Sequence, residues 1–256
     1  MKKKIAVICA YNNDEILNGM LEQSCIQQDV LVEKKYYKNK YPSAAETFLN
    51  AIRETDAEIL CFVHQDFRFS QCNFLKLLAE EIMSEPRALY GLCGAVRENG
   101  QIHVYSNMFH GIQNVNIGEK LTGKKQVQGL DEVFVACHRS VFEEIGFDPD
   151  VMDGWHLYVQ DLCMQAQEKG IPVYVLPLSS QHKSILEMPE YLQVYGLYPD
   201  VFYTYLKKLK KKHCSCLNEI ICPCIAITTT EPKFSLKSGY LLLKTRWKRY
   251  LRRKSL

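Results

Sequence analysis

Residues 58–67 read EILCFVHQDF, and this stretch decides how the rest of the chain is interpreted. Its apolar run at 59–63 is uninterrupted, which is typical of a strand buried on both faces of a mostly parallel sheet. Three hydrogen-bonding residues follow at once: His64, Gln65 and Asp66. Open α/β sheets bind ligands just beyond the carboxyl ends of their strands, where these side chains would lie.

A carboxylate beside an imidazole at this edge favours a divalent cation that carries a diphosphate, because hard cations prefer oxygen ligands. The alternative is a plain polar turn in which Asp66 caps the strand. The stretch alone leaves both interpretations open.

Helices and strands alternate around this segment. We predict strands at residues 5–10, 30–37 and 89–96, and helices at residues 14–27, 43–55 and 73–83. Ser43 with Glu46 three residues later forms a capping box at the start of the second helix. The order β-α-β-α-β-α-β predicts an α/β fold with a Rossmann-like, mostly parallel central sheet flanked by helices.

The regular alternation ends near residue 96. We predict that residues 97–126 form a long polar loop with a weak strand at 102–105. The later elements are expected to be a strand with an internal bend at 127–139, a short helix at 140–145, a helix at 158–170 ended by Gly170, a strand at 171–178, a loop at 179–184 and a helix at 191–212.

The composition is that of a globular protein. Of 256 residues, 47% are hydrophobic and 24% are charged, and no run has the roughly 18 apolar residues of a membrane span. The apolar run at 5–10 is too short for a signal peptide, so we read it as the first strand. We therefore expect a cytoplasmic protein whose eleven cysteines are thiols or metal ligands rather than disulfides.

Charge divides the chain into two parts. Residues 240–256 carry seven cations and no acid, which gives this tail a charge of +7. Because the whole chain has a net charge of +3, the remainder carries −4. We predict an α/β domain over residues 1–186 and a helical, cysteine-containing, basic C-terminal extension over residues 187–256.

The basic tail also has an apolar face at helical spacing, made of Leu242, Leu243, Trp247, Tyr250 and Leu251. Such a face between cations favours a helix that lies on an anionic membrane surface. A solvated basic helix and a nucleic-acid-binding segment are the alternatives.

Four cysteines lie close together in the extension, as two C-x-C pairs: Cys214, Cys216, Cys222 and Cys224. Zinc sites more often use C-x₂-C spacing, so we favour packed thiols over a zinc or redox clip.

Three polar clusters lie at strand or helix ends, at residues 64–66, 153–161 and 181–182. Together they suggest a metal-assisted site in which Asp66 holds the ion and His182 completes the shell as a neutral imidazole. Asp161, in the first turn of a helix, would act as a base on an acceptor hydroxyl. The alternatives are an ordinary helix-start acid and a surface histidine.

These segments resemble the GT-A fold glycosyltransferases of the family-2-like group, in particular their bacterial capsule-type branch. The resemblance covers roughly residues 5–184. It is carried by the opening strand at 5–12, by SAAETFLNAIRETDAEILCFVHQDF from residue 43, by VQGLDEVFVACHRSVFEEIGFDPDVMDGWHLYVQDLCMQAQEKGI from residue 127 and by QHKS from residue 181.

The resemblance implies roles for particular residues. The HQD sequence stands where most GT-A enzymes have Asp-x-Asp, so Asp66 matches the metal-binding Asp and His64 replaces the first one. Gln160 and Asp161 match a Glu-Asp pair whose Asp is the base in inverting enzymes. His182 matches a histidine that also binds the metal in related enzymes.

The implied activity is inverting transfer of a sugar from a nucleotide-diphosphate sugar to a glycan or lipid-linked acceptor, in surface polysaccharide biosynthesis, with Mn²⁺ or Mg²⁺ as cofactor. Other residues are expected to bind substrate: Tyr11 and Asn12 near the nucleoside, Asp131 and Glu132 at an internal bend on the acceptor side, and Trp155 and His156 against a sugar. A core aromatic is the alternative for Trp155, and a turn acid is the alternative for Asp131.

Two other functions fit the sequence. One is a GT-A-like domain that binds nucleotide sugar or glycan without turnover, and the other is a nucleic-acid-binding protein that acts through its tail. We favour the enzyme, placed at the inner face of the membrane through the tail, and expect no nucleic-acid partner.

Overall fold

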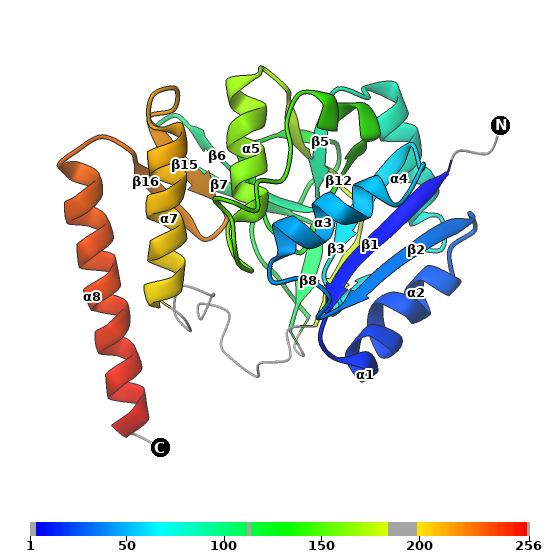
Figure 1. Ribbon diagram of the computed structural model, residues 1–256, viewed down its shortest axis with the longest axis horizontal. Coiled ribbons are helices and arrows are strands. Elements are labelled where there is room, and N and C mark those ends of the chain that lie inside the picture. The colour runs from blue at the N-terminus through cyan, green and yellow to red at the C-terminus, as the bar shows by residue number, and fades with distance from the viewer. Residues whose placement is uncertain (1–3, 112–113, 184–198, 255–256) are drawn as a thin grey trace.

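The computed structural model describes residues 4–111, 114–183 and 199–254 (Figure 1). At its centre is a sheet of seven strands in the order β10-β13-β5-β12-β3-β1-β2. These strands are β1 (Ile5–Tyr11), β2 (Val32–Lys38), β3 (Ile59–Val63), β5 (Leu89–Gly91), β10 (Lys125–Gln126), β12 (Phe134–His138) and β13 (Val173–Val175).

The central sheet is mostly parallel, as predicted. β1 runs parallel to β2 and β3, and β13 runs parallel to β5. β12 lies between β3 and β5 and is antiparallel to both, and β10 is antiparallel to β13. Every residue of β3 is buried, in agreement with its uninterrupted apolar sequence.

Helices cover both faces of this sheet (Figure 1). The bounds are α1 (Asp14–Leu17), a π-helical turn η1 (Asn18–Glu22), α2 (Gln23–Ile26), α3 (Ala44–Arg53), α4 (Phe74–Ser84), the 3₁₀ turn η2 (Arg139–Glu143) and α5 (Tyr158–Glu168). Neighbouring residues of a strand point to opposite faces: Leu60 and Phe62 belong to the core beneath α3 and α5, whereas Ile59 and Cys61 belong to the core beneath α1, α2 and α4.

Local capping signals in the sequence are confirmed. The Ser43 hydroxyl accepts a hydrogen bond from the Glu46 backbone N–H at 3.1 Å, and Asn13 Oδ1 accepts one from Ile16 N–H at 3.2 Å. Gly170 follows α5 with φ +62°, the left-handed conformation that a glycine C-terminal to a helix adopts.

Two expectations for residues 89–126 were wrong. The strand predicted at 89–96 divides at Leu92 into β5 and β6 (Cys93–Glu98), which belong to different sheets. The weak strand predicted at 102–105 is confirmed as part of β7 (Gln101–Ser106), but much of the region predicted to be loop around it also forms strands. β6 pairs with β7 over six residues, and β8 (Met108–His110) pairs with β9 (Val115–Asn116).

Strands that follow β3 and β5 along the chain belong to two smaller sheets. One has the order β11-β6-β7, where β11 is Gly129–Leu130. The other has the order β4-β14-β8-β9, where β4 is Phe67–Phe69 and β14 is Ser180–His182. The loop predicted at 179–184 is therefore a strand over 180–182, and residue 184 lies outside the described part.

The C-terminal extension contains α7 (Pro199–His213), the hairpin β15 (Glu219–Cys222) and β16 (Ile225–Thr228), and α8 (Lys233–Lys254). Residues 191–198 of the predicted helix at 191–212 lie outside the described residues, and the remainder is confirmed as α7. α7 lies between α5 and α8 (Figure 1), and its Phe202, Leu206 and Leu209 are part of the core that includes α3 and α5.

Within the described residues, none of the helices combines the length and the apolar character needed to cross a bilayer.

Candidate metal and active site

The HQD turn is tied to the end of the neighbouring strand β1. The Gln65 side-chain oxygen accepts hydrogen bonds from the backbone N–H groups of Asn12 and Asn13 at 3.1 and 3.0 Å. Gln65 Nε2 donates to Asn12 Oδ1 at 2.9 Å, and His64 N–H donates to the Val133 carbonyl at 3.0 Å. Because β1 and β3 are parallel neighbours, their carboxyl ends meet, which places Asn12 beside the turn. Contact of Asn12 with a nucleoside stays a prediction.

A distant strand brings His182 to the same turn. β14 pairs with β4 so that His182 lies opposite Phe67, the residue after Asp66. The Lys183 N–H donates to the Asp66 carbonyl at 2.9 Å. As a result, His182 Nε2 lies 3.2 Å from Asp66 Oδ2.

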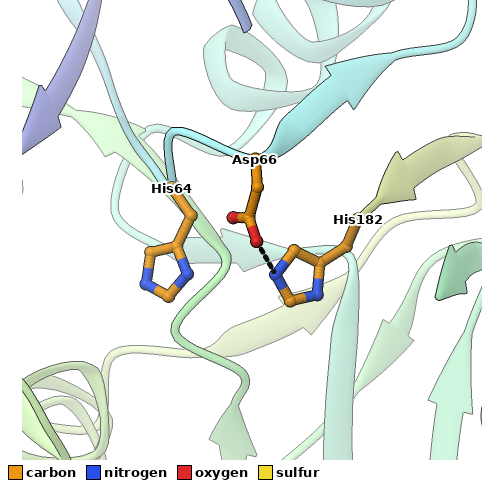
Figure 2. A group of neighbouring side chains, drawn as sticks. All are labelled: His64, Asp66 and His182. Atoms are coloured by element: carbon orange, nitrogen blue, oxygen red, sulfur yellow. Dashed lines mark ion pairs between the residues drawn. The ribbon is translucent and has the colours of Figure 1, made fainter. Parts of the chain in front are cut away.

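His64, Asp66 and His182 form the one cluster of three or more potential metal ligands among the described residues. Their ligand atoms all lie within 4.8 Å of one another. Figure 2 shows the Asp66 carboxylate between the two imidazoles, with an ion pair to His182. Two imidazole nitrogens and one carboxylate oxygen are donors that fit a divalent cation such as Mn²⁺.

Burial and mutual charge shift the pKa values of the three ligands in different directions. Burial alone would raise the pKa of Asp66, but the His182 and His64 imidazoles outweigh it and hold that pKa below its usual value. Burial lowers the pKa of His64, which keeps its imidazole neutral. Burial opposes the charged form of His182 as well, but the Asp66 carboxylate outweighs it and raises the pKa of His182.

Three residues that sequence reasoning did not assign support this cluster: Gln65, His110 and Tyr158. Tyr158, the first residue of α5, places its hydroxyl 3.1 Å from His64 Nε2. His110 Nδ1 lies 3.3 Å from His182 Nδ1. Gln65 stood inside the HQD motif, but His110 lay in a segment read as loop and offered no local signal.

Asp131 and Glu132 lie at a bend between β11 and β12, as predicted. Asp131 Oδ1 accepts a hydrogen bond from Val133 N–H at 3.0 Å, so this carboxylate shapes the bend. The Glu132 carbonyl accepts one from the Tyr158 hydroxyl at 3.4 Å, which connects the bend to His64 through Tyr158. Their contacts with substrate stay predictions.

The Glu132 carboxyl group lacks a hydrogen-bond partner for one of its oxygens among the described residues. That oxygen, Oε1, is buried. Burial raises the pKa of Glu132 well above its usual value, and the nearby Asp131 carboxylate adds to the rise. Backbone N–H groups of Leu157 and Tyr158, at the start of α5, offset part of this effect.

Trp155 and His156 lie in the loop before α5. Trp155 is 43% exposed and therefore accessible from solvent. His156 is half-buried, and burial together with nearby His64 lowers its pKa to about 4. His156 is therefore a neutral imidazole near His64, and its contact with a sugar stays a prediction.

This loop is held on both sides. The Gly154 carbonyl accepts a hydrogen bond from Ala44 N–H at the start of α3, at 3.0 Å. On the other side, Asp153 accepts hydrogen bonds from the Tyr205 hydroxyl at 2.9 Å and from Lys208 at 2.6 Å, both on α7. A Cβ added to Gly154 would lie 2.1 Å from the Tyr205 oxygen, so a larger residue there would displace the Tyr205 hydroxyl.

Asp161 has a different environment from the one expected of a base. Its side chain is 1% exposed and faces α7. Oδ1 accepts from His213 Nε2 at 2.7 Å, and Oδ2 accepts from Lys212 at 2.9 Å and from Gln165 at 2.8 Å. These contacts describe a buried ion pair and give no support to a role as base, which stays a prediction.

Tyr11 is the last residue of β1, and its carbonyl accepts a hydrogen bond from Asn39 N–H at 3.0 Å. Its place at the strand end is the one predicted, and contact with a nucleoside stays a prediction.

The cysteines of the extension do not form a metal cluster among the described residues. Cys222 and Cys224 flank the turn of the β15–β16 hairpin with their sulfur atoms 3.1 Å apart, and Cys214 and Cys216 are exposed.

Solved structures with the same fold are glycosyltransferases. A structure of GalNAc-T7 with UDP, GalNAc and Mn²⁺ aligns with a TM-score of 0.54 at 12% identity, over 82% of this chain and 55% of that one. S. aureus TarS aligns with a TM-score of 0.55 at 12% identity, over 83% of this chain and 39% of that one. The chain thus spans about half or less of the length of these two proteins.

A third structure, of the mannosyltransferase PcManGT from Pyrobaculum calidifontis in complex with GDP-Man and Mn²⁺, aligns with a TM-score of 0.53 at 12% identity. The alignment covers 96% of this chain and 72% of that one. The fold is therefore that of the GT-A glycosyltransferases.

The family model described as "Glycosyltransferase like family" matches residues 6–191, well over half of the chain. The chain belongs to this family. No curated protein matches the sequence.

Proposed function

We propose that this chain transfers a sugar from a nucleotide-diphosphate sugar to a glycan or lipid-linked acceptor, with a divalent metal ion as cofactor. The observation that carries the proposal is the cluster of His64, Asp66 and His182 at the carboxyl edge of a GT-A sheet. Two similar structures contain Mn²⁺ together with a nucleotide or a nucleotide sugar, which supports the same donor class here.

The chain's own residues divide the work. Asp66 and the two imidazoles would hold the cation, which when bound neutralises charge on the leaving diphosphate. The Gln65 bonds to Asn12 and Asn13 hold the turn in place beside the end of β1. Trp155 and His156 would bind the sugar from the loop before α5.

Transfer with inversion needs a base that takes the acceptor proton on the face opposite the leaving group. Two carboxyl groups near the start of α5 are candidates: Asp161, as predicted from the resemblance, and Glu132. The unpartnered Glu132 Oε1 and its raised pKa suit a base better than the paired Asp161 carboxylate does. A hexosyl donor, inversion and a place in capsule-type surface polysaccharide synthesis belong to this proposal and rest on the resemblance.

The first test is a thermal-shift panel of UDP, GDP, CDP and dTDP, each with and without Mn²⁺. We expect one nucleotide to raise the melting temperature only when Mn²⁺ is present, because a ligand of the folded state stabilises it by mass action. The Asp66→Asn variant should lose this shift, whereas Asp56→Asn, a change at an exposed acid outside the site, should keep it.

If no nucleotide shifts the wild-type protein, a metal-dependent transferase is excluded and the remaining candidate is a domain that binds glycan without turnover. A shift that is independent of both Mn²⁺ and Asp66 would place the nucleotide outside this cluster.

We also propose that α8 attaches the enzyme to an anionic membrane surface at the inner face of the membrane. Leu236, Tyr240, Leu243 and Trp247 are 62–71% exposed and follow one another at intervals of four, three and four residues, so they form one stripe. α8 contains nine lysines and arginines and no acid. Leu242, expected on the same face, instead lies half-buried against the core.

A basic helix with an apolar stripe fits anionic lipid better than a second copy of itself, because two such helices would repel each other. Flotation with vesicles of phosphatidylglycerol and phosphatidylcholine tests this point. We expect binding that falls with salt and is lost in a Leu243→Glu/Trp247→Glu variant but not in Ser235→Glu. Equal binding to purely zwitterionic vesicles, or retention in the double variant, would contradict it, and dimerisation or binding to nucleic acid would identify another partner.

A further inference from the structure

We propose that His110 is a positioning residue for the metal site: its Nδ1 accepts the Nδ1–H of His182 and thereby directs the lone pair of His182 Nε2 toward the cation. The inference rests on the metal site of the proposed function. His110 itself would not touch the cation.

The register of two strands places these histidines side by side. β14 runs parallel to β8, with His182 paired to His110, so both side chains project from the same face. The Gly111 N–H donates to the His182 carbonyl at 3.0 Å and holds this register at the strand end. The Nδ1 atoms are 3.3 Å apart, and the rings are nearly perpendicular, at 88° with centroids separated by 5.4 Å.

Only one hydrogen can lie between two nitrogens at this distance, so the two neutral rings must adopt complementary tautomers. With both rings neutral and no cation, His182 Nε2–H would donate to Asp66 Oδ2, and His182 Nδ1 would accept from His110 Nδ1–H. This arrangement leaves His110 Nε2 as a bare acceptor, and that atom is buried with no partner among the described residues.

Metal binding requires the other pair of tautomers. When Nε2 of His182 binds a cation, the ring proton is on Nδ1, which then donates to His110 Nδ1. The His110 proton is then on Nε2, so each ring keeps one proton and the pair stays neutral. A partner for the second ring nitrogen fixes the orientation of a metal-binding histidine, and losing such a partner typically weakens metal binding about 10- to 100-fold.

Three substitutions of His110 distinguish a role as hydrogen-bond acceptor for His182 from a role in packing alone. His110→Asn places a carbonyl oxygen near the position of Nδ1, and His110→Gln places its amide one bond farther out, near Nε2. His110→Phe keeps a ring of similar size but has no acceptor. The Asn/Gln pair is matched in polarity, so their comparison carries the test even if the Phe variant does not fold.

Mn²⁺ affinity is measured by electron paramagnetic resonance, from the signal of free aqueous Mn²⁺ during titration of the full chain. We expect His110→Gln and His110→Phe to bind about 10- to 100-fold more weakly than wild type and His110→Asn to stay within about threefold of it. His182→Ala serves as the positive control, and melting temperatures confirm that each variant is folded.

The outcomes are distinguishable. If wild type does not bind Mn²⁺, the metal site of the proposed function fails. If wild type binds and His110→Gln binds equally well, the role of His110 is overturned while the metal site stands. Equal weakening in Asn and Gln also overturns it, because the position of the acceptor would then not matter.

Discussion

Two acids near the start of α5 have opposite surroundings. Asp161 is enclosed by His213, Lys212 and Gln165, so its charge is neutralised inside the protein. Glu132 has a buried oxygen without a partner among the described residues, on the same bend that contacts Tyr158. Removing one partner of a buried ion pair is strongly destabilising, whereas replacing a buried carboxyl group that lacks a partner for one oxygen costs little.

These surroundings predict different effects for two isosteric changes. Glu132→Gln should lower kcat by about 100-fold or more without loss of stability, as expected for removal of a base. Asp161→Asn should cost about 3–5 kcal/mol of unfolding free energy, because it leaves buried cations without their carboxylate. Initial rates at saturating donor measure the change in kcat of both variants. Urea unfolding of both variants measures the change in the free energy of unfolding.

A stable Asp161→Asn protein that has lost turnover would restore Asp161 as the base. Unchanged kcat in Glu132→Gln would remove Glu132 from the chemistry.

At the scale of elements, the ion network of His213 joins α5 to α7. Its Nε2 donates to Asp161 Oδ1 at 2.7 Å and its Nδ1 to Glu168 Oε1 at 2.8 Å, so both ring nitrogens carry protons and the ring is an imidazolium. Burial opposes this charge, but the Asp161 and Glu168 carboxylates outweigh it and raise the pKa of His213.

The raised pKa of His213 predicts a pH dependence of stability. Because the folded-state pKa lies above the ordinary value of 6.5, the stabilisation is complete below about pH 6.5 and is lost as pH rises through the raised pKa. A tenfold gain in proton affinity on folding corresponds to about 1.4 kcal/mol of unfolding free energy. Urea unfolding between about pH 6 and about pH 9 should show a steeper decline for wild type than for His213→Gln.

His103, a half-buried histidine on the edge strand β7 that pairs with Glu119, gives a matched control through His103→Gln, because a surface ion pair contributes little to stability. Parallel pH profiles for wild type and His213→Gln would show that His213 does not couple the two helices.

At the scale of the whole molecule, the extension and the α/β domain have a common core. Phe202, Leu206 and Leu209 of α7 and Ile220 of β15 are buried in one cluster with residues of β1, β3 and α5. The boundary predicted between residues 186 and 187 lies outside the described residues and stays a prediction. The common core predicts that the two parts unfold together.

Leu209→Ala should cost about 2–5 kcal/mol and shift the whole unfolding transition, because it leaves a cavity in this common core. Leu236→Ala, at an exposed position of α8, should change stability by no more than about 0.5 kcal/mol. Urea unfolding followed by far-ultraviolet circular dichroism checks both. Two separate transitions, with only one moved by Leu209→Ala, would support an independent extension.

What could be predicted from the sequence was mainly what local signals specify. The buried run of β3, the cap at Ser43 and the glycine after α5 each depend on neighbouring residues, and each was found. His110 and His182 are 72 residues apart and meet only because β8 pairs with β14. Asp161 and His213 are 52 residues apart, so nothing near Asp161 in the sequence indicates its partner.

The loop that carries Trp155 is bonded to α7 through Asp153 and fits against Tyr205 at Gly154. A substrate that orders this loop would therefore also slow amide hydrogen exchange in α7. Thermodynamic linkage makes the relation reciprocal: whatever holds α7 in place must tighten substrate binding by the same factor. Through this loop, the C-terminal extension would be coupled to occupancy of the proposed sugar site.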